Sequence, residues 1–356
     1  MVNTSTRGVK MKDILNYTKE ELADMLQEAG FPSYRGKQIY EWLYTKLIDK
    51  PDEMNNLPLA LRLWLKNNFN CKFPVIIKEQ ISKIDGTTKF LLQLKDKKTV
   101  ETVLMFHGGK NSRKRKTLCI SSQIGCPIGC VFCATGKMGL DRNLTTGEVI
   151  GQILTVIQRH GDIDNIVYMG MGEPLLNYDS VIKSIRIIID EPGLNISVRK
   201  ITISTCGLVP EIKKLAEEAI PLTLAISLHA SNNELRNVLV PINRKYPIED
   251  LLDSVKFFID KTNRKVTFEY ILAKDLNDSI YHAKQLAELL RSLLCNINII
   301  PANPVEGTEM RKPNAKTVNN FCHILQSKGI ETVVRSEKGS DIDAACGQLM
   351  AKTNLK

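Results

Sequence analysis

Short apolar segments alternate with longer amphipathic segments from about residue 116 onward, and this alternation constrains the fold more than any other feature. The short segments are typical of strands and span residues 117–122, 165–171, 200–206, 222–228, 266–273, 297–301 and 332–336. The longer segments carry apolar residues at helical spacing and span residues 145–161, 179–190, 209–219, 248–261, 279–293 and 317–329. This pattern predicts βα units around a parallel sheet. Because there are too few units for a closed eight-stranded barrel, we expect an α/β core, a partial (β/α)6 barrel of about six parallel strands, over residues 116–356.

Two segments of different character precede this core. Residues 1–72 predict a small helical accessory unit, in which Thr18 and Glu21 form a capping box and Gly30 ends the first helix. Residues 73–115 hold short β-branched runs separated by turn sequences, followed by a basic loop. We therefore expect a helical accessory domain, then a short antiparallel β extension, then the core.

The composition excludes several classes of protein. No run approaches the roughly eighteen apolar residues of a membrane-spanning helix, and no segment near the N-terminus has the apolar length of a signal peptide. Nine cysteines in 356 residues, an odd number, argue against a disulfide framework and for metal-binding or catalytic thiols in a reducing compartment. We therefore expect a cytoplasmic protein without membrane association. Four cysteines are interpreted as ordinary small residues: Cys71, Cys206, Cys295 and Cys322.

The chain is strongly basic, with a formal net charge of +10. Five of the seven residues in "KNSRKRK", residues 110–116, are Lys or Arg. A basic surplus of this kind favours a polyanionic partner, of which nucleic acid is the commonest soluble example. The alternative is a solvated basic loop with no partner.

Unusual polar sequences follow most of the predicted strands. "GCPIGCVFC" follows the first, "MGMGEP" the second, "STCG" the third, "SLHAS" the fourth, "NP" the sixth and "DIDAACGQ" the last. In βα folds the functional groups collect at the carboxyl ends of the strands. These loops therefore predict one site at one rim of the barrel.

The first of these loops carries three closely spaced cysteines, Cys126, Cys130 and Cys133. A four-cysteine zinc site normally brings two close pairs, whereas three thiolates can hold three irons of a cubane and leave the fourth iron open to a ligand. The spacing alone leaves two alternatives open. One is a zinc site completed by Cys119 or a distant histidine, and the other is a set of buried core cysteines.

The Cx3Cx2C motif after the first strand of a partial barrel resembles the radical S-adenosylmethionine (SAM) superfamily. The segment "MGMGEP", residues 169–174, is similar to the segment of that superfamily that binds the SAM amino group. The resemblance implies a [4Fe-4S] cluster on Cys126, Cys130 and Cys133, whose open iron is chelated by SAM. It also implies that reductive cleavage of SAM yields a 5′-deoxyadenosyl radical.

Further motifs resemble the RlmN/Cfr family of RNA adenine methyltransferases: "LCISSQIGC", "MGMGEPLLN", "AISLHA", "VPINRKYPI", "IPANP" and "GSDIDAACGQL". The resemblance implies that Cys346 accepts a methyl group from one SAM and that a second SAM supplies the radical. It implies that Cys119 resolves the protein–RNA adduct, leaving a disulfide with Cys346, and that Glu101 is the proton acceptor. The implied SAM contacts are Gly172, Glu173, Ser204, Ser227, Leu228, His229 and Asn303. Without the resemblance, Glu101 is interpreted as an exposed strand carboxylate and His229 as a packed, hydrogen-bonded histidine.

The family has two branches that differ in the carbon they methylate. "GEPLLN" resembles RlmN, which modifies carbon 2 of an adenosine in 23S rRNA and in the tRNA anticodon loop, whereas "CATG" resembles Cfr, which modifies carbon 8 of the rRNA adenosine and confers antibiotic resistance. We predict the RlmN branch. The implied partners are 23S rRNA, tRNA and an electron donor such as flavodoxin, with the enzyme itself a monomer. The helical unit and the basic run are then expected to dock RNA.

Overall fold

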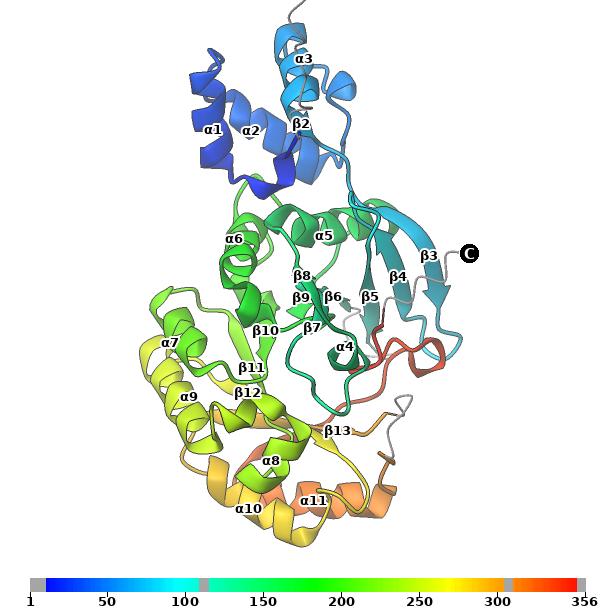
Figure 1. The fold of residues 1–356 in the computed structure, drawn as a ribbon, viewed down its shortest axis with the longest axis vertical. Coiled ribbons are helices and arrows are strands. Elements are labelled where there is room, and N and C mark those ends of the chain that lie inside the picture. The colour runs from blue at the N-terminus through cyan, green and yellow to red at the C-terminus, as the bar shows by residue number, and fades with distance from the viewer. Residues whose placement is uncertain (1–10, 109–114, 304–309, 351–356) are drawn as a thin grey trace, which may run out of the picture.

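The computed structural model describes residues 11–108, 115–303 and 310–350. Its centre is one sheet of ten strands in the order β14-β13-β12-β11-β10-β9-β6-β5-β4-β3 (Figure 1). These strands are β3 (Val75–Ile81), β4 (Thr88–Gln93), β5 (Thr99–His107), β6 (Arg115–Cys119), β9 (Asn165–Tyr168), β10 (Ile201–Thr205), β11 (Thr223–Ser227), β12 (Val266–Leu272), β13 (Cys295–Pro301) and β14 (Glu331–Val334).

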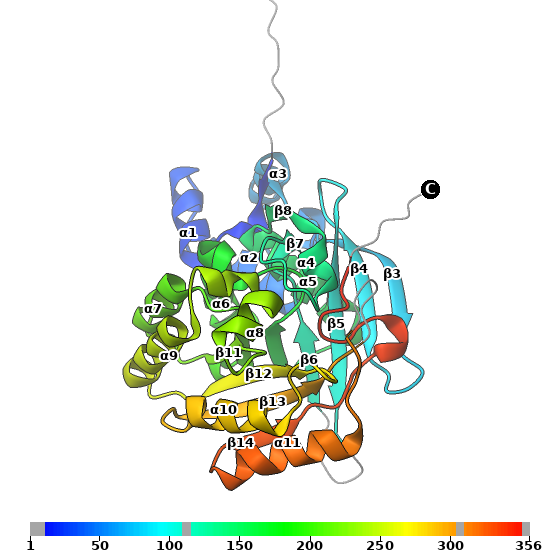
Figure 2. The ribbon, with the colours of Figure 1, turned by 60° about the horizontal axis from the view of Figure 1, so that its bottom comes forward.

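Within the described ranges, the seven strands β6 and β9 to β14 pair in parallel with one another. The sheet curves, and most of the core helices lie around its outside (Figure 2). The predicted fold class, a partial barrel of βα units, is confirmed. It has one parallel strand more than the expected six because the short, largely exposed strand β14 also pairs in parallel with β13.

The helices that connect the parallel strands begin and end where local sequence signals predict. Thr145 caps α5 through a capping box with Glu148, and Asn263 ends α9 in a left-handed conformation. Apolar residues on one face of each helix pack against the sheet. The core helices are α4 (Ala134–Lys137), α5 (Thr146–His160), α6 (Tyr178–Ile189), α7 (Val209–Glu217), α8 (Asn233–Leu239), α9 (Ile248–Thr262), α10 (Ile280–Leu290) and α11 (Ala315–Ser327).

The N-terminal helices form a small unit beside α5 and α6 (Figure 1). The predicted capping box between Thr18 and Glu21 is present at the start of α1. Lys19 forms an ion pair with Asp190 at the end of α6, with 3.0 Å between Nζ and Oδ1, and so ties the unit to the core. Its elements are β1 (Lys12–Asp13), α1 (Lys19–Glu28), α2 (Arg35–Tyr40), α3 (Leu59–Asn68) and β2 (Phe69–Asn70), with β1 and β2 paired in parallel.

The predicted antiparallel extension consists of β3, β4 and β5, which pair as a meander. It is not a separate sheet, because β5 pairs antiparallel with β6 and so continues the barrel sheet. A second hairpin, β7 (Gln123–Cys126) with β8 (Gly139–Asn143), projects from the end of β6. None of the helices in the described ranges is long and apolar enough to cross a membrane.

Candidate active site

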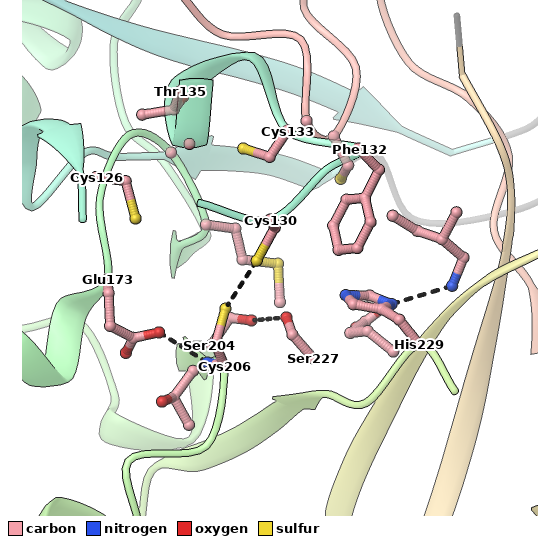
Figure 3. Close-up of a pocket in the computed structure, with 18 of the residues that line it drawn as sticks. Cys126, Cys130, Phe132, Cys133, Thr135, Glu173, Ser204, Cys206, Ser227 and His229 are labelled. Carbon is pink, nitrogen blue, oxygen red and sulfur yellow. Dashed lines mark hydrogen bonds between the residues drawn. The ribbon is translucent and has the colours of Figure 1, made fainter. Parts of the chain in front are cut away.

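Two adjoining cavities open at the carboxyl ends of the parallel strands. The first lies beneath the hairpin of β7 and β8 and contains the cysteine triplet (Figure 3). The second lies between β5, β6 and the C-terminal segment and contains Cys119. The residues that line both cavities include Cys133, Met169, Arg335 and Cys346.

The hairpin of β7 and β8 shapes the loop that carries the triplet. Gly125 has φ of +76°, and a Cβ at this position would collide with the carbonyl oxygen of Gly139 on the facing strand. The register of the hairpin shifts between Ile124 and Gly125, which sets the course of the chain into Cys126. Glycine is therefore required by this turn, and the thiols are placed by local backbone geometry.

All three thiols of the triplet line the first cavity, where they face a shared space in Figure 3. Cys126 and Cys130 are buried and Cys133 is partly buried. Burial raises the pKa of Cys126 to about 12 and also raises the pKa of Cys133. Without a metal the thiols of Cys126 and Cys133 stay protonated, and a bound metal would deprotonate them.

This donor set fits a [4Fe-4S] cluster better than a zinc ion. No group of three or more His, Cys, Asp or Glu side chains in the described part of the chain is arranged to hold a single metal ion. In a cubane each thiolate binds a different iron, so the three sulfurs need not converge on one point. Cys119, which could complete a zinc site, lines the second cavity rather than the first.

The loop after β9 brings Glu173 to the first cavity. Gly172 has φ of +102°, and a Cβ there would lie 2.6 Å from Cβ of Gln123, so only glycine allows this close approach. The Glu173 side chain accepts hydrogen bonds from the backbone N–H groups of Cys206 (2.7 Å) and Leu175 (3.1 Å). Burial raises the pKa of Glu173, which is 2% exposed. The Glu173 side chain is therefore held in a fixed position in the cavity that contains the triplet.

Strands β10 and β11 end in hydroxyl and imidazole groups that line the same cavity. The hydroxyl oxygens of Ser204 and Ser227 lie 3.4 Å apart. His229 accepts a hydrogen bond at Nδ1 from the backbone N–H of Ile271 (3.1 Å), and burial lowers its pKa to about 3. The imidazole is therefore neutral at physiological pH, and the proton must be on Nε2. His229 is the packed, hydrogen-bonded histidine that the pattern alone predicts, and it also lines the first cavity.

Two of the predicted SAM contacts lie elsewhere. Leu228 is fully buried and does not line the first cavity, and its backbone N–H bonds to the carbonyl of Glu269. Asn303 lines the second cavity, where Nδ2 donates to the carbonyl oxygen of Cys346 at 3.4 Å. The first cavity therefore gathers Gly172, Glu173, Ser204, Ser227 and His229, whereas Asn303 lies with the C-terminal segment.

Cys119 and Cys346 both line the second cavity, although they come from opposite ends of the core sequence. Cys346 is exposed and also lines the first cavity, whereas Cys119 is buried. Burial raises the pKa of Cys119 to about 12. All nine cysteines are free thiols, so the disulfide expected between Cys119 and Cys346 is not formed in this structure.

Glu101 lines neither cavity. Its side chain is not the exposed strand carboxylate expected from the pattern alone, because the residue is only 6% exposed. One carboxylate oxygen lies 3.3 Å from Nζ of Lys89, and the other accepts a hydrogen bond from the backbone N–H of Met350 at 2.7 Å. Burial raises the pKa of Glu101, and Lys89 opposes that rise. Glu101 therefore holds the segment that carries Cys346.

Two residues of the site were missed by sequence reasoning. Cys206, interpreted as an ordinary small residue, lines the first cavity with its sulfur 3.8 Å from that of Cys130 (Figure 3). Arg236 is fully buried and donates to the carbonyls of Cys206 (2.6 Å) and Leu228 (3.1 Å), so it holds the ends of β10 and β11 in place. The position of Cys206 in "STCG" was a usable signal, whereas an arginine on a short polar helix gives none.

The basic run of residues 110–116 lies largely outside the described residues, which resume at Arg115. Lys116, at the start of β6, donates through Nζ to the carbonyl of His160 at 2.8 Å. That lysine therefore has an intramolecular contact, and the RNA-docking role of the run stays a prediction.

Comparison with known protein families gives one match to the N-terminal helical unit and another to the barrel. The family model described as "Radical SAM superfamily" matches residues 120–287, and the model described as "Ribosomal RNA large subunit methyltransferase N-terminal domain" matches residues 12–70. The probable dual-specificity RNA methyltransferase RlmN of Thermotoga neapolitana is 48% identical over 346 residues, covering 97% of this chain and 99% of that protein. Its counterpart in Clostridium novyi is 45% identical over 340 residues, covering 95% and 98%.

A solved structure shares the whole fold. The crystal structure of a radical SAM methyltransferase from Sphaerobacter thermophilus has a TM-score of 0.91 to this chain at 43% sequence identity. The match covers 96% of this chain and all of that one. The helical unit, the extended sheet and the barrel are thus found together in that methyltransferase.

Proposed function

The chain belongs to the RlmN family of radical SAM RNA methyltransferases, and we propose that it methylates carbon 2 of an adenosine in 23S rRNA and of an adenosine in the tRNA anticodon loop. The observation that carries this proposal is the position of Cys346, which lines both the cavity of the triplet and the cavity of Cys119. A methyl carrier needs this position, because it must meet the methyl donor on one side and the resolving thiol on the other.

The proposed carrier answers a chemical difficulty in the substrate. Carbon 2 of adenine is electrophilic and has no lone pair, so it cannot displace a methyl group from a sulfonium. The Cys346 thiolate can: its electron pair forms the new S–CH3 bond, the sulfonium C–S bond breaks, and the thioether leaves with the bonding pair. One SAM is used in this way and a second supplies the radical, so each turnover consumes two.

The first cavity is proposed to hold the cluster and SAM. When bound, they supply the 5′-deoxyadenosyl radical that activates the methyl on Cys346. Cys126, Cys130 and Cys133 are the proposed iron ligands, and Glu173 offers a buried carboxylate for the amino group of SAM. Ser204, Ser227 and the Nε2 proton of His229 offer hydrogen bonds on the opposite side of the cavity.

Release of the product is proposed to use Cys119. Its thiolate attacks the Cys346 sulfur, and an S–S bond forms. The electron pair of the broken S–CH2 bond passes to the methylene carbon, which takes up a proton. The resulting disulfide must then be reduced by a thiol reductant. Glu101 is the proposed proton acceptor on the adenine. Its bond to Met350, close in sequence to Cys346, supports a position next to the segment of the methyl carrier, but its carboxylate pairs with Lys89 and lines neither cavity in this structure.

The remaining partners are proposals of the same kind. The N-terminal helical unit, together with the basic run, would dock the RNA, and the excess of positive charge favours that contact. An electron donor such as flavodoxin would reduce the cluster. The enzyme would act as a monomer in the cytoplasm.

Mass spectrometry of RNA nucleosides tests the proposal directly. The reconstituted enzyme is incubated with SAM, a reductant, and either a 23S rRNA fragment or tRNA. We expect 2-methyladenosine in both RNAs and none with the Cys346→Ala variant. 8-Methyladenosine would instead make this a Cfr-type enzyme, and unmodified tRNA would restrict the substrate to rRNA.

A further inference from the structure

One partly buried cation stands where the two cavities meet. Arg335, directly after β14, lines both cavities together with Cys346, and its side chain is 28% exposed. Among the described residues that line the first cavity, it is the only Lys or Arg. In the second cavity it is accompanied by Lys338. The guanidinium is therefore shared between the cofactor side and the thiol side of the site.

Several contacts hold Arg335 at this junction. Its backbone N–H donates to the carbonyl of Ile299 at 2.9 Å, which fixes the chain beside β13. Its Nη1 lies 3.6 Å from Oε1 of Glu269 and 3.8 Å from the sulfur of Met169. The same Glu269 oxygen accepts a hydrogen bond from Asn298 at 2.9 Å, whereas Oε2 of Glu269 is buried without a hydrogen-bond partner. The ion pair is long, and the guanidinium keeps donors for other anions.

The two functional thiols present an electrostatic difficulty. Methyl acceptance by Cys346 and resolution by Cys119 both require thiolates, because the thiolate is the nucleophile. Burial raises the pKa of Cys119 to about 12, so a free energy cost opposes its ionisation at neutral pH. A fixed cation beside both sulfurs would lower that cost.

We propose that Arg335 is a positioning residue that stabilises the thiolates of Cys346 and Cys119, with Glu269 holding the guanidinium between the two cavities. This inference rests on the roles of the two thiols in the proposed function. The exposed Cys346 thiol loses its proton to water. An electron pair on the sulfur of the resulting thiolate then attacks the methyl donor. The guanidinium is neither oxidised nor deprotonated and contributes only its charge.

The charges of the two thiols affect the pKa of Arg335, and the charge of Arg335 affects the pKa of Cys119. The negative charge of Cys346 is the largest cause of a raised pKa at Arg335, followed among the favourable causes by Glu269 and Cys119. Burial is the largest influence on the pKa of Cys119 and raises it, whereas the backbone hydrogen bond of Met169 and, by a smaller amount, the charge of Arg335 lower it.

Several of the other charged groups around the thiols have ion-pair partners of their own. Lys338 lies 3.9 Å from Asp85, Glu337 pairs with Lys312, and Lys89 pairs with Glu101. The elements that surround Cys119 and Cys346 carry the following charged or titratable residues: Lys89 of β4, Glu101 and His107 of β5, Cys133 of the triplet loop, Glu269 of β12, and Glu337, Lys338 and Asp343 of the C-terminal segment.

Thiol alkylation as a function of pH tests this role without measuring turnover. The full-length protein is made in a cell-free translation mixture depleted of SAM, so that Cys346 carries no methyl group. It is treated with iodoacetamide between pH 6 and 10, and alkylation of each cysteine is quantified by peptide mass spectrometry. We expect Arg335→Met to slow alkylation of Cys346 and Cys119 about tenfold at neutral pH, because the thiolate is the reactive form and the neighbouring cation is lost. Arg335→Lys, which keeps the charge, should recover most of the rate.

Two controls make the result specific. Lys338→Met removes the other cation of the second cavity and should leave both rates unchanged. Cys295, far from the site at the start of β13, should react equally in every variant and reports that the fold is intact. If Arg335→Met unfolds, the neutral but polar Arg335→Gln carries the same expectation.

Unchanged rates at Cys346 and Cys119 in a folded Arg335→Met or Arg335→Gln protein would overturn the inference, as would an equal effect of Lys338→Met. Failure of the proposed function has a different signature. In that case Cys346 of wild-type protein, reconstituted with cluster and SAM, would acquire no methyl group whatever its alkylation profile.

Discussion

The cysteine triplet and the cysteine pair are built in opposite ways. Cys126, Cys130 and Cys133 share one hairpin loop, and backbone geometry at Gly125 places them. Cys119 and Cys346 come from the first parallel strand and from the segment after the last one. The contacts that bring this pair to one cavity are all distant in sequence, such as those from Glu101 to Met350 and from Lys89 to Asp343. The proposed cofactor ligation thus depends on local geometry, whereas the proposed methyl transfer depends on the assembled sheet.

The largest expected effect separates the two members of the pair. Cys346→Ala should acquire no methyl group and form no RNA adduct, because the carrier sulfur is missing. Cys119→Ala should still be methylated and should accumulate as a covalent protein–RNA species, because no thiolate remains to displace the product. Denaturing electrophoresis of each variant isolated with cellular RNA, before and after nuclease digestion, measures both outcomes.

The two roles are wrongly assigned if Cys346→Ala carries RNA or if Cys119→Ala turns over fully. Digestion of the adduct adds a second result, because the linked carbon of adenine distinguishes carbon 2 from carbon 8.

The next effect tests whether the triplet is complete without Cys206, the fourth thiol of the first cavity. Anaerobically purified wild-type protein should contain about four irons per chain, as one cubane requires. Cys130→Ala should lose most of this iron. Cys206→Ala should keep it, because a fourth protein thiolate would close the iron that SAM must chelate. Iron and sulfide analysis of the three proteins gives the answer, and equal losses in both variants would make Cys206 a ligand.

A smaller effect is expected where the pair depends on a distant ion pair. Lys89 and Glu101 have side chains that are each 8% exposed, so Lys89→Met leaves a buried carboxylate without its cation. Loss of one partner of a buried pair costs about 3 kcal/mol, which corresponds to about a hundredfold faster hydrogen exchange of the segment that holds Cys346 and Met350. Exchange measured by mass spectrometry should locate the change to that segment and leave the hairpin of the triplet protected.

This effect should depend on pH in a defined direction. Burial already raises the pKa of Glu101, and removal of Lys89 raises it further. A group whose pKa is raised in the folded state stabilises that state at low pH, and the stabilisation is lost as pH rises through the folded-state pKa. Protection in Lys89→Met should therefore be retained in acid and lost toward neutral pH. The double variant Lys89→Met with Glu101→Gln, in which neither charge remains, should regain much of the protection, and its failure to do so would show that packing rather than charge holds the segment.

The sequence by itself determined the features that depend on neighbouring residues. The alternation of segments predicted the βα barrel, the capping box at Thr18 marked a helix start, and the spacing of three cysteines identified the thiol loop. Each follows from short-range geometry, because capping, periodicity and turn formation involve residues only a few positions apart.

Only the tertiary structure decided which distant residues share a cavity. Helical spacing could not show that Arg236 is fully buried under two strand ends, that Arg335 lines both cavities together with Cys346, or that Cys206 faces Cys130. The pattern placed Glu101 on a strand but not beneath the C-terminal segment. Periodicity says which face of an element is buried, whereas the partner buried against it is set by strand order and curvature of the whole sheet.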